Sequence, residues 1–137
     1  MLVKDIMTPN IHAIRNTSTI DKAAQMMHKH NIGIIPVMYE DYTMCGVLTD
    51  RDIVLRCISE KKNAQECTAG DICTPSVITI ESNKTIDEAL QKIGRKQIKR
   101  LVVTENETPI GIISLSDIAR VRSSTDTARA LTGISMP

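Results

Sequence analysis

The sequence contains no phenylalanine and no tryptophan, and its two tyrosines make up an aromatic content of 1% in 137 residues. The hydrophobic core must therefore consist of aliphatic side chains. Proteins that hold single-stranded nucleic acids stack bases on aromatic rings, so the composition does not indicate this class of binding. The 17 basic and 16 acidic residues leave a net charge of +1, which gives no reason to expect nucleic acid or an anionic membrane as a partner.

Long hydrophobic runs and closely spaced cysteine pairs are also missing. No segment approaches the ~18 apolar residues of a membrane span, and the N-terminus has no signal-peptide pattern, so we expect a cytoplasmic location. The cysteines are too widely spaced for structural zinc or a C-x-x-C redox site, and they are Cys45, Cys57, Cys67 and Cys73. We expect four free thiols and no metal site, with a regulatory disulfide between two of the cysteines as the alternative.

The chain contains one sequence unit twice. DIMTPNIHAIRNTSTIDKAAQ, which starts at Asp5, aligns with DICTPSVITIESNKTIDEALQ, which starts at Asp71, at a constant offset of 66 residues. Beyond Met38 the offset becomes 65, so that Gly46 aligns with Gly111 and Asp52 with Asp117. Such a repeat indicates two copies of one structural unit. We expect a first unit at residues 1–60, a linker at 61–70, a second unit at 71–124 and a C-terminal tail at 125–137.

Both copies predict the order strand, helix, strand, strand, helix, which gives an α+β fold of two βαββα units. Thr19 and Thr85 each precede apolar residues at helical spacing and are typical helix caps. Two β-branched runs joined by a polar turn then predict a hairpin in each copy. The expected elements are strands at 11–14 and 77–80, helices after Thr19 and Thr85, hairpins of 34–38 with 45–48 and of 101–104 with 110–113, and closing helices at 52–58 and 117–122.

These repeated motifs resemble a tandem pair of CBS domains, the Bateman module. The resemblance rests on the Thr-Pro turn, the Thr-Ile-Asp-x-Ala helix start and the hairpin that ends in Gly-h-h-[TS]-x-x-Asp-Ile, where h is a hydrophobic residue, [TS] is threonine or serine and x is any residue. It runs from about residue 3 to about residue 122. It implies two units packed with pseudo-two-fold symmetry and a cleft on each side of their interface. It also implies a regulatory module without enzymatic activity that binds AMP, ADP, ATP or an S-adenosyl ligand, requires no cofactor, forms a homodimer and signals to a separate effector protein.

The hydroxyl and the carboxylate of the last motif allow two interpretations. Thr49 with Asp52, and Ser114 with Asp117, stand at the start of an expected helix, where either pair is a good N-terminal cap. A carboxylate at that place can also accept hydrogen bonds from the two hydroxyls of a ribose. Spacing alone favours the cap, whereas the resemblance favours a ligand site, because CBS domains hold ribose at these positions.

The resemblance implies two ligand clefts with different chemistry. Lys99 and Arg100 could neutralise a phosphate, so we expect the cleft with Asp52 to be the stronger site for a phosphorylated nucleotide. The other cleft is expected to be empty or to hold a less charged ligand, such as an adenosyl thioether. The first cleft comprises Val47, Leu48, Thr49, Arg51, Asp52, Val77, Ile78, Lys99, Arg100 and Leu101, and the second comprises Ile11, His12, Ala13, Gly33, Ile34, Ile35, Ile112, Ile113, Ser114 and Asp117.

An enzyme is not indicated, because the sequence has no Gly-rich phosphate loop and no G-x-S-x-G nucleophile motif. His28 and His30 are two residues apart on a helix and do not share a face. The alternative to a ligand sensor is a dimerisation scaffold that binds no ligand, for example in a stress response.

Overall fold

The computed structural model describes residues 1–75 and 77–122. The chain divides into two compact units. One unit is Ile11–Val77, named here the first-repeat unit, and the other joins Met1–Asn10 to the chain from Ile78 onward, named here the second-repeat unit. The expected tail at 125–137 lies outside the described residues.

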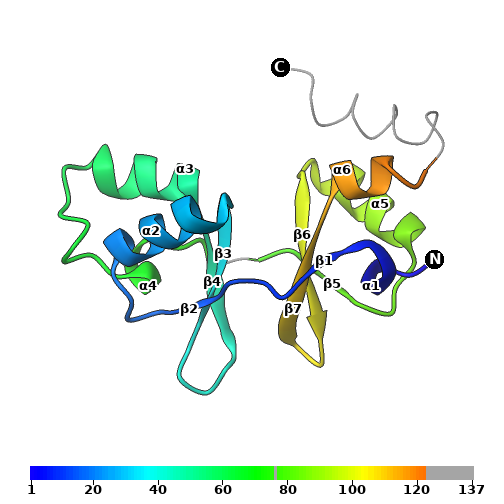
Figure 1. The fold of residues 1–137 in the computed structure, drawn as a ribbon, viewed down its shortest axis with the longest axis horizontal. Helices are drawn as coiled ribbons and strands as arrows, with labels where there is room; N and C mark the ends of the chain where they lie inside the picture. Colours follow the sequence, from blue (N-terminus) through cyan, green and yellow to red (C-terminus); the bar gives the residue numbers. More distant parts are fainter. Residues whose placement is uncertain (76, 123–137) are drawn as a thin grey trace. The chain divides into compact units, whose positions relative to one another are not determined.

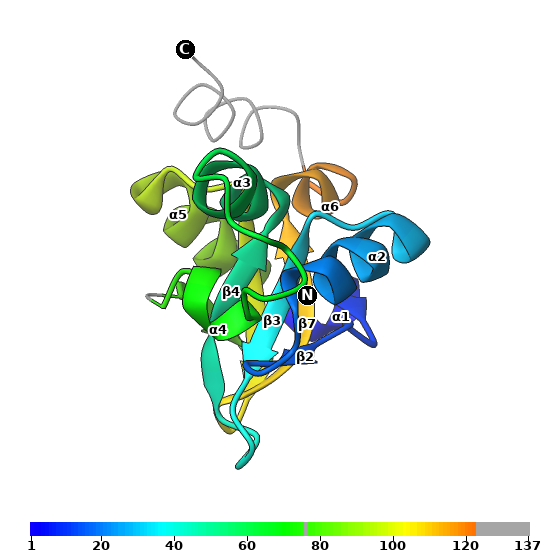
Figure 2. The same ribbon diagram turned by 90° about the vertical axis from the view of Figure 1, so that its left-hand side faces the viewer.

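The first-repeat unit contains a three-stranded sheet in the order β2-β3-β4 (Figure 2). Strand β2 (Ile14–Arg15) is parallel to β3 (Ile34–Met38), and β3 is antiparallel to β4 (Met44–Thr49). The parallel pair requires a crossover connection, which helix α2 (Ile20–His30) provides. Helix α3 (Asp50–Ile53) follows β4 and continues into the π-helical turn η1 (Val54–Ile58), and the short helix α4 (Ala69–Ile72) comes later.

The second-repeat unit has the same plan, with one additional named strand. Its sheet has the order β1-β7-β6-β5, in which β5 (Thr79–Glu81) is parallel to β6 (Arg100–Glu105) and β6 is antiparallel to β7 (Thr108–Ser114). Strand β1 (Thr8–Pro9) pairs with β7. The helices are α1 (Val3–Ile6), α5 (Ile86–Lys96) and α6 (Leu115–Ala119). The predicted α+β class and its repetition are therefore confirmed.

Each Thr-Pro segment joins the sheet of the other repeat. Thr8 precedes the first repeat's strand, yet it pairs with Ile112 of β7. Thr74 precedes the second repeat's strand, yet it forms an antiparallel bridge with Val47 of β4. The boundaries of the compact units therefore differ from those of the sequence repeat. The expected domain boundaries describe the sequence repeat and remain a prediction.

The long helices begin and end as their sequences predict. The Thr19 and Thr85 hydroxyls accept hydrogen bonds from the backbone N–H groups of Lys22 and Glu88, both at 3.2 Å. Both helices end at a residue in the left-handed region, Asn31 and Gln97. The buried stripes have the predicted spacing, and they are Ile20, Ala23 and Met27 in α2 and Ile86, Ala89 and Ile93 in α5.

The structure differs from the sequence-based expectation at several element boundaries. The first strands are shorter and start later than 11–14 and 77–80, and the closing helices start at Asp50 and Leu115, directly after their cap residues. Helices α1 and α4 were not expected. Thr68 and Asp71 form a capping box that starts α4, although the polar composition of this segment indicated a linker.

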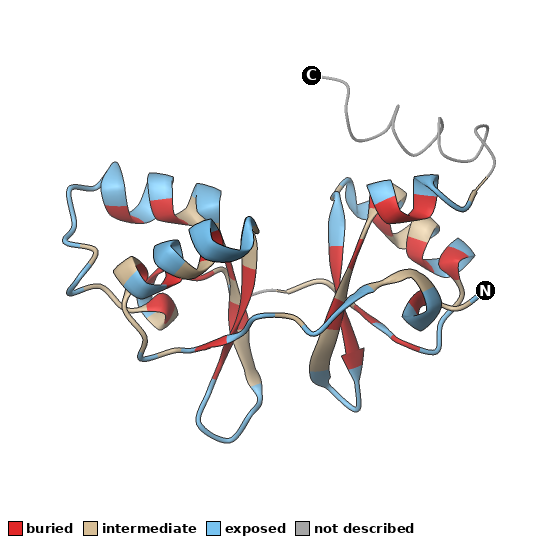
Figure 3. Cartoon of the chain, viewed as in Figure 1, coloured by how far each residue is buried: buried red, intermediate tan, exposed pale blue. Residues whose placement is uncertain are grey.

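Each unit has its own aliphatic core. Buried residues lie on the helix faces that meet the sheets (Figure 3), and no tyrosine is buried among the described residues. The first-repeat core includes Ile20, Ile35 and Leu48, and the second-repeat core includes Ile93, Leu101, Ile113 and Ile118.

Among the described residues, no helix combines the length and the apolar character needed to cross a membrane.

The glycine in the second strand of each hairpin is required by close packing. A Cβ atom on Gly46 would lie 2.3 Å from the Thr74 carbonyl oxygen and 3.0 Å from the Cys73 sulfur. A Cβ atom on Gly111 would lie 2.5 Å from the Met7 sulfur and 2.9 Å from the Thr8 carbonyl oxygen. The Thr-Pro segment can therefore lie against the strand only where the strand has no side chain.

We predict that Gly46→Ala lowers the free energy of unfolding by about 1–3 kcal/mol, because the Thr74 backbone must move away from β4. Gly94→Ala is the matched control. A Cβ atom there meets nothing within 4 Å, and the change from glycine to alanine inside helix α5 should stabilise the protein by about 0.5–1 kcal/mol. Urea unfolding of both variants measures the difference, and equal stabilities would contradict the packing constraint.

Candidate functional site

The two candidate carboxylates stand where each hairpin ends and its closing helix begins. The Thr49 hydroxyl accepts from the Asp52 N–H at 3.0 Å, and an Asp52 carboxylate oxygen accepts from the Thr49 N–H at 3.0 Å. Ser114 and Asp117 repeat this exchange at 3.1 and 2.9 Å. Both pairs are thus reciprocal capping boxes. The exchange engages one oxygen of each carboxylate with the main chain, and a carboxylate has about four acceptor positions in total.

Both carboxylates are largely buried. The exposed fraction of the side chain is 13% in Asp52 and 10% in Asp117. An arginine lies beside the second oxygen of each. The Arg56 Nε is 3.9 Å from the Asp52 Oδ1, and Arg120 forms an ion pair with the Asp117 Oδ1. Each unit therefore presents a carboxylate at the end of its hairpin, with one oxygen held by the main chain and the other beside a guanidinium.

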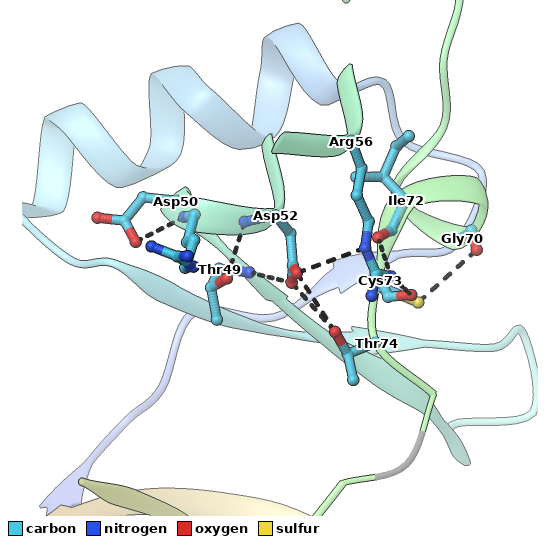
Figure 4. A network of polar contacts seen from close by, with 9 residues as sticks. Thr49, Asp50, Asp52, Arg56, Gly70, Ile72, Cys73 and Thr74 are labelled. Carbon is cyan, nitrogen blue, oxygen red and sulfur yellow. Dashed lines mark hydrogen bonds and ion pairs between the residues drawn. The ribbon is translucent and has the colours of Figure 1, made fainter. Parts of the chain in front are cut away.

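Asp52 has an additional hydroxyl partner (Figure 4). The Thr74 hydroxyl lies 3.3 and 3.4 Å from the two Asp52 carboxylate oxygens and donates to them. Among the residues that the structure describes, Thr8 makes no matching bond to Asp117. Thr74 was not among the predicted site residues, although its place in the repeated Thr-Pro motif was a signal that could have identified it.

Arg56 connects this carboxylate to helix α4. Its Nη1 donates to the carbonyl oxygens of Ile72 and Cys73 at 3.2 and 3.3 Å (Figure 4). The aligned residue of the second repeat is Val121, which cannot make such bonds. The polar network around Asp52 is therefore specific to the first-repeat unit.

The adjacent charged pair, Asp50 and Arg51, is also specific to the first repeat. Arg51 is exposed, and its N–H donates to the Asp50 Oδ1 at 2.9 Å. The Asp50 N–H donates to the Gly33 carbonyl oxygen at 3.0 Å, and a Cβ atom on Gly33 would lie 3.2 Å from the Asp50 carboxylate. Asp50 is thus fixed at the start of β3, while the Arg51 side chain faces solvent.

The hairpin registers show which predicted site residues lie together within a unit. Ile34 pairs with Thr49, and Ile35 pairs with Leu48. In the second-repeat unit Arg100 pairs with Ser114, and Leu101 pairs with Ile113. Residues assigned to different clefts therefore share one hairpin end. The assignment of Lys99 and Arg100 to the same ligand as Asp52 remains a prediction, and so does that of Ile11, His12, Ala13, Gly33 and Ile34 to the same ligand as Asp117.

Alternate residues of each strand have different roles. Four of the predicted site residues are fully or almost fully buried in the cores, and they are Ile35, Leu48, Leu101 and Ile113. The side chains of these four pack inside the protein, so that only their backbone groups could face a ligand. Partly exposed residues alternate with these four along the strands, and they are Ile34, Val47, Thr49, Ile112 and Ser114. Three further predicted site residues are partly exposed on the segments before the first strands, and they are Ile11, Val77 and Ile78.

His12 contacts a residue that the sequence did not pair with it. Its ring stacks on that of His30, with the centroids 3.6 Å apart and the planes 14° apart. Partial desolvation lowers the pKa of His30, and the nearby His12 and Lys29 lower it further. Within the described part of the chain, no cluster of three or more histidine, cysteine or acidic residues is arranged to hold a metal ion.

Comparison with known proteins identifies both repeats. The family model of the CBS domain matches residues 3–58 and 69–124. CBS domain-containing protein YhcV of Bacillus subtilis is 34% identical over 134 residues, which cover 97% of this chain and 94% of that protein. Hypoxic response protein 1 of Mycobacterium tuberculosis is 32% identical over 117 residues, which cover 85% of this chain and 82% of that protein.

Solved structures have the same fold. The crystal structure of Hypoxic Response Protein I with two coordinated zinc ions has a TM-score of 0.80 at 30% identity and covers 90% of this chain and 100% of that one. The CBS domain pair of protein MJ0100, in complex with 5′-methylthioadenosine and S-adenosyl-L-methionine, has a TM-score of 0.75 at 28% identity. That alignment covers 88% of this chain and 94% of the other.

We predict that Thr49→Val lowers the free energy of unfolding by about 1 kcal/mol, because it removes the cap hydroxyl from the start of α3. Thr49→Ser keeps the hydroxyl and should stay within a few tenths of a kcal/mol of the wild type. Urea unfolding compares the two variants. A valine variant as stable as the serine variant would show that this cap does not support the fold.

Proposed function

This chain belongs to the CBS domain family, and from that premise we propose that it is a regulatory module that binds an adenosine-containing ligand and signals to a separate protein. The observation that carries the proposal is the repeated pair of hydroxyl and carboxylate, Thr49 with Asp52 and Ser114 with Asp117, at the end of each hairpin. A CBS pair that is 28% identical to this chain has been solved with two adenosyl ligands, which supports the same ligand class here.

The carboxylates suit a ribose for three physical reasons. Each is an acceptor of hydrogen bonds, and the two neighbouring hydroxyls of a ribose are donors. Each is largely buried, so that a hydrogen bond to its charge is stronger than in water. Each is also fixed by its capping box before a ligand arrives, which reduces the ordering cost of binding.

We further propose that the two carboxylates do not prefer the same ligand. Asp52 already accepts from Thr74 and lies near Arg56, so a ribose there must share or displace the Thr74 hydroxyl. Lys99 and Arg100 are exposed cations that suit a phosphorylated nucleotide. Because Arg100 lies opposite Ser114 in the β6–β7 register, the test of its role must compare Asp52 with Asp117.

A second function, dimerisation without a ligand, is favoured by a different observation. The turn η1 exposes three apolar side chains, with Val54 at 55%, Leu55 at 47% and Ile58 at 57% exposure. Large apolar side chains that gather on one surface indicate a protein–protein contact more often than isolated ones do. We therefore propose that η1 contributes to a homodimer interface, whether or not a ligand binds.

We predict that calorimetric titration with AMP, ATP, S-adenosylmethionine and 5′-methylthioadenosine detects binding of at least one of them. Asp52→Asn or Asp117→Asn should weaken that binding by about 10-fold to 100-fold, the value of a hydrogen bond to a charged group. Arg100→Ala should weaken AMP and ATP more than 5′-methylthioadenosine, which carries no phosphate.

Asp71→Asn is the matched control for this titration. Asp71 forms the same kind of capping box with Thr68, but it is not one of the proposed ligand residues, so its variant should bind with unchanged affinity. If none of these ligands binds, the proposed role as a ligand sensor is refuted, and the dimerisation scaffold remains as the alternative function. If a ligand still binds with unchanged affinity to both aspartate variants, the assignment of the binding site to Asp52 and Asp117 is refuted, whereas the proposed function as a ligand-binding module stands.

We predict that Ile58→Asp converts a wild-type dimer into a monomer, because it places a charge in the proposed apolar interface. Sedimentation velocity measures the change. Tyr42→Asp is the control, since Tyr42 is 70% exposed but lies in the β3–β4 turn. A wild-type protein that sediments as a monomer at every concentration would exclude the interface.

A further inference from the structure

All four cysteines of the chain lie in the first-repeat unit. The sulfur atoms of Cys45 and Cys73 are 3.8 Å apart, although 28 positions separate the two residues in the sequence. Cys57 belongs to the buried core of the same unit, and Cys67 packs against that core. All four are free thiols in the structure.

The backbone around Cys45 and Cys73 is held on both sides. Val47 and Thr74 exchange two backbone hydrogen bonds of 3.0 and 2.8 Å, and the Cys73 sulfur lies over Gly46, where a Cβ atom would come within 3.0 Å of it. Arg56 holds the Cys73 carbonyl oxygen. A disulfide bond is about 2.05 Å long, so the two sulfur atoms need to approach by about 1.8 Å, which side-chain rotation can provide.

We propose that Cys45 and Cys73 form a reversible intramolecular disulfide and are a thiol switch next to Asp52. The oxidant is a small-molecule disulfide such as glutathione disulfide. The Cys45 thiolate attacks it, forms a mixed disulfide and releases one glutathione thiolate. The Cys73 thiolate then attacks the Cys45 sulfur and releases the second. The protein loses two protons and two electrons, and the oxidant becomes two thiols.

The order of these steps follows from the environment of each thiol. Cys45 is partly exposed, whereas Cys73 is buried. Burial is the main cause that raises the pKa of Cys73 to about 11, Cys45 and Asp52 raise it further, and Arg56 opposes them. The few Cys73 thiolates present at neutral pH would react slowly with a dissolved oxidant. The 3.8 Å separation compensates, because it gives the second step a high effective concentration.

The disulfide would act on the segment that carries Thr74. It would join this segment to β4 by a covalent bond, in addition to the hydrogen bonds between Val47 and Thr74. The Thr74 hydroxyl would then be held on the Asp52 carboxylate, with which it is already in contact. We therefore expect the oxidised protein to bind an adenosine ligand at Asp52 less tightly than the reduced protein, and this expectation rests on the proposed function.

The test uses the full chain with Cys57→Ser and Cys67→Ser, so that only Cys45 and Cys73 remain. After equilibration with glutathione disulfide and alkylation, the mass should fall by about 2 Da relative to the reduced chain, with no free thiol and no bound glutathione. Dithiothreitol should restore both thiols. The oxidised form should melt about 10–15 °C higher, as expected for a cross-link that closes a loop of this length.

Two controls keep the test decisive. Cys45→Ser in the same background should retain one free thiol and show no rise in melting temperature. Peptide mapping of the oxidised wild type, with trypsin and a protease that cleaves before Asp71 and so separates Cys67 from Cys73, should join the peptides that contain Cys45 and Cys73. This gives a result even if the serine at the buried Cys57 prevents folding. Glutathione mixed disulfides without this joined pair, at every redox ratio, would overturn the proposal.

Ligand titration of the two redox forms separates the switch from the proposed function. Weaker binding by the oxidised form supports the coupling to Asp52, and equal binding by both forms overturns it. If the disulfide forms and neither redox state binds any adenosine ligand, the proposed function fails while the disulfide stands.

Discussion

The close contact between a Thr-Pro segment and a glycine is the constraint on which the rest of each unit depends. Because Gly46 has no side chain, the Thr74 backbone can pair with Val47. This pairing places the Thr74 hydroxyl on Asp52 and the Cys73 sulfur beside Cys45. In the second-repeat unit, Gly111 allows the same contact with the Thr8 segment. One missing methyl group thus determines which functional groups meet at the end of the hairpin.

The two units show how one backbone plan can carry two different chemistries. Their hairpins, caps and carboxylates match closely. The side chains around the carboxylates do not match, since Asp52 is approached by Thr74 and Arg56, and Asp117 by Arg120. The cysteines occur in one unit only. A duplicated scaffold can therefore keep one backbone plan in both copies while the side chains around each carboxylate differ.

The sequence predicted the features that depend on neighbouring residues. Helical spacing after Thr19 and Thr85, and the β-branched runs of the hairpins, are local signals, and the structure confirms them. The partner of each Thr-Pro segment was not predictable, because its pairing with the other repeat's hairpin is a long-range contact that no local pattern encodes. Helix α4 was missed for another reason. Its capping residues, Thr68 and Asp71, stand in a polar stretch whose composition suggested a linker.

The two interpretations of Thr49 and Asp52, helix cap and ligand site, are physically compatible. The cap bonds engage one Asp52 oxygen and fix the side chain, so the entropy of ordering this carboxylate is lost on folding and not on binding. Among the residues that the structure describes, the polar partners of the other oxygen are the Thr74 hydroxyl and the more distant Arg56. The Thr74 bond is long for a hydroxyl donor to a carboxylate, so a better donor can replace it at little cost. A helix cap held in this way keeps acceptor positions that a diol could use, so the cap alone does not argue against the proposed ligand.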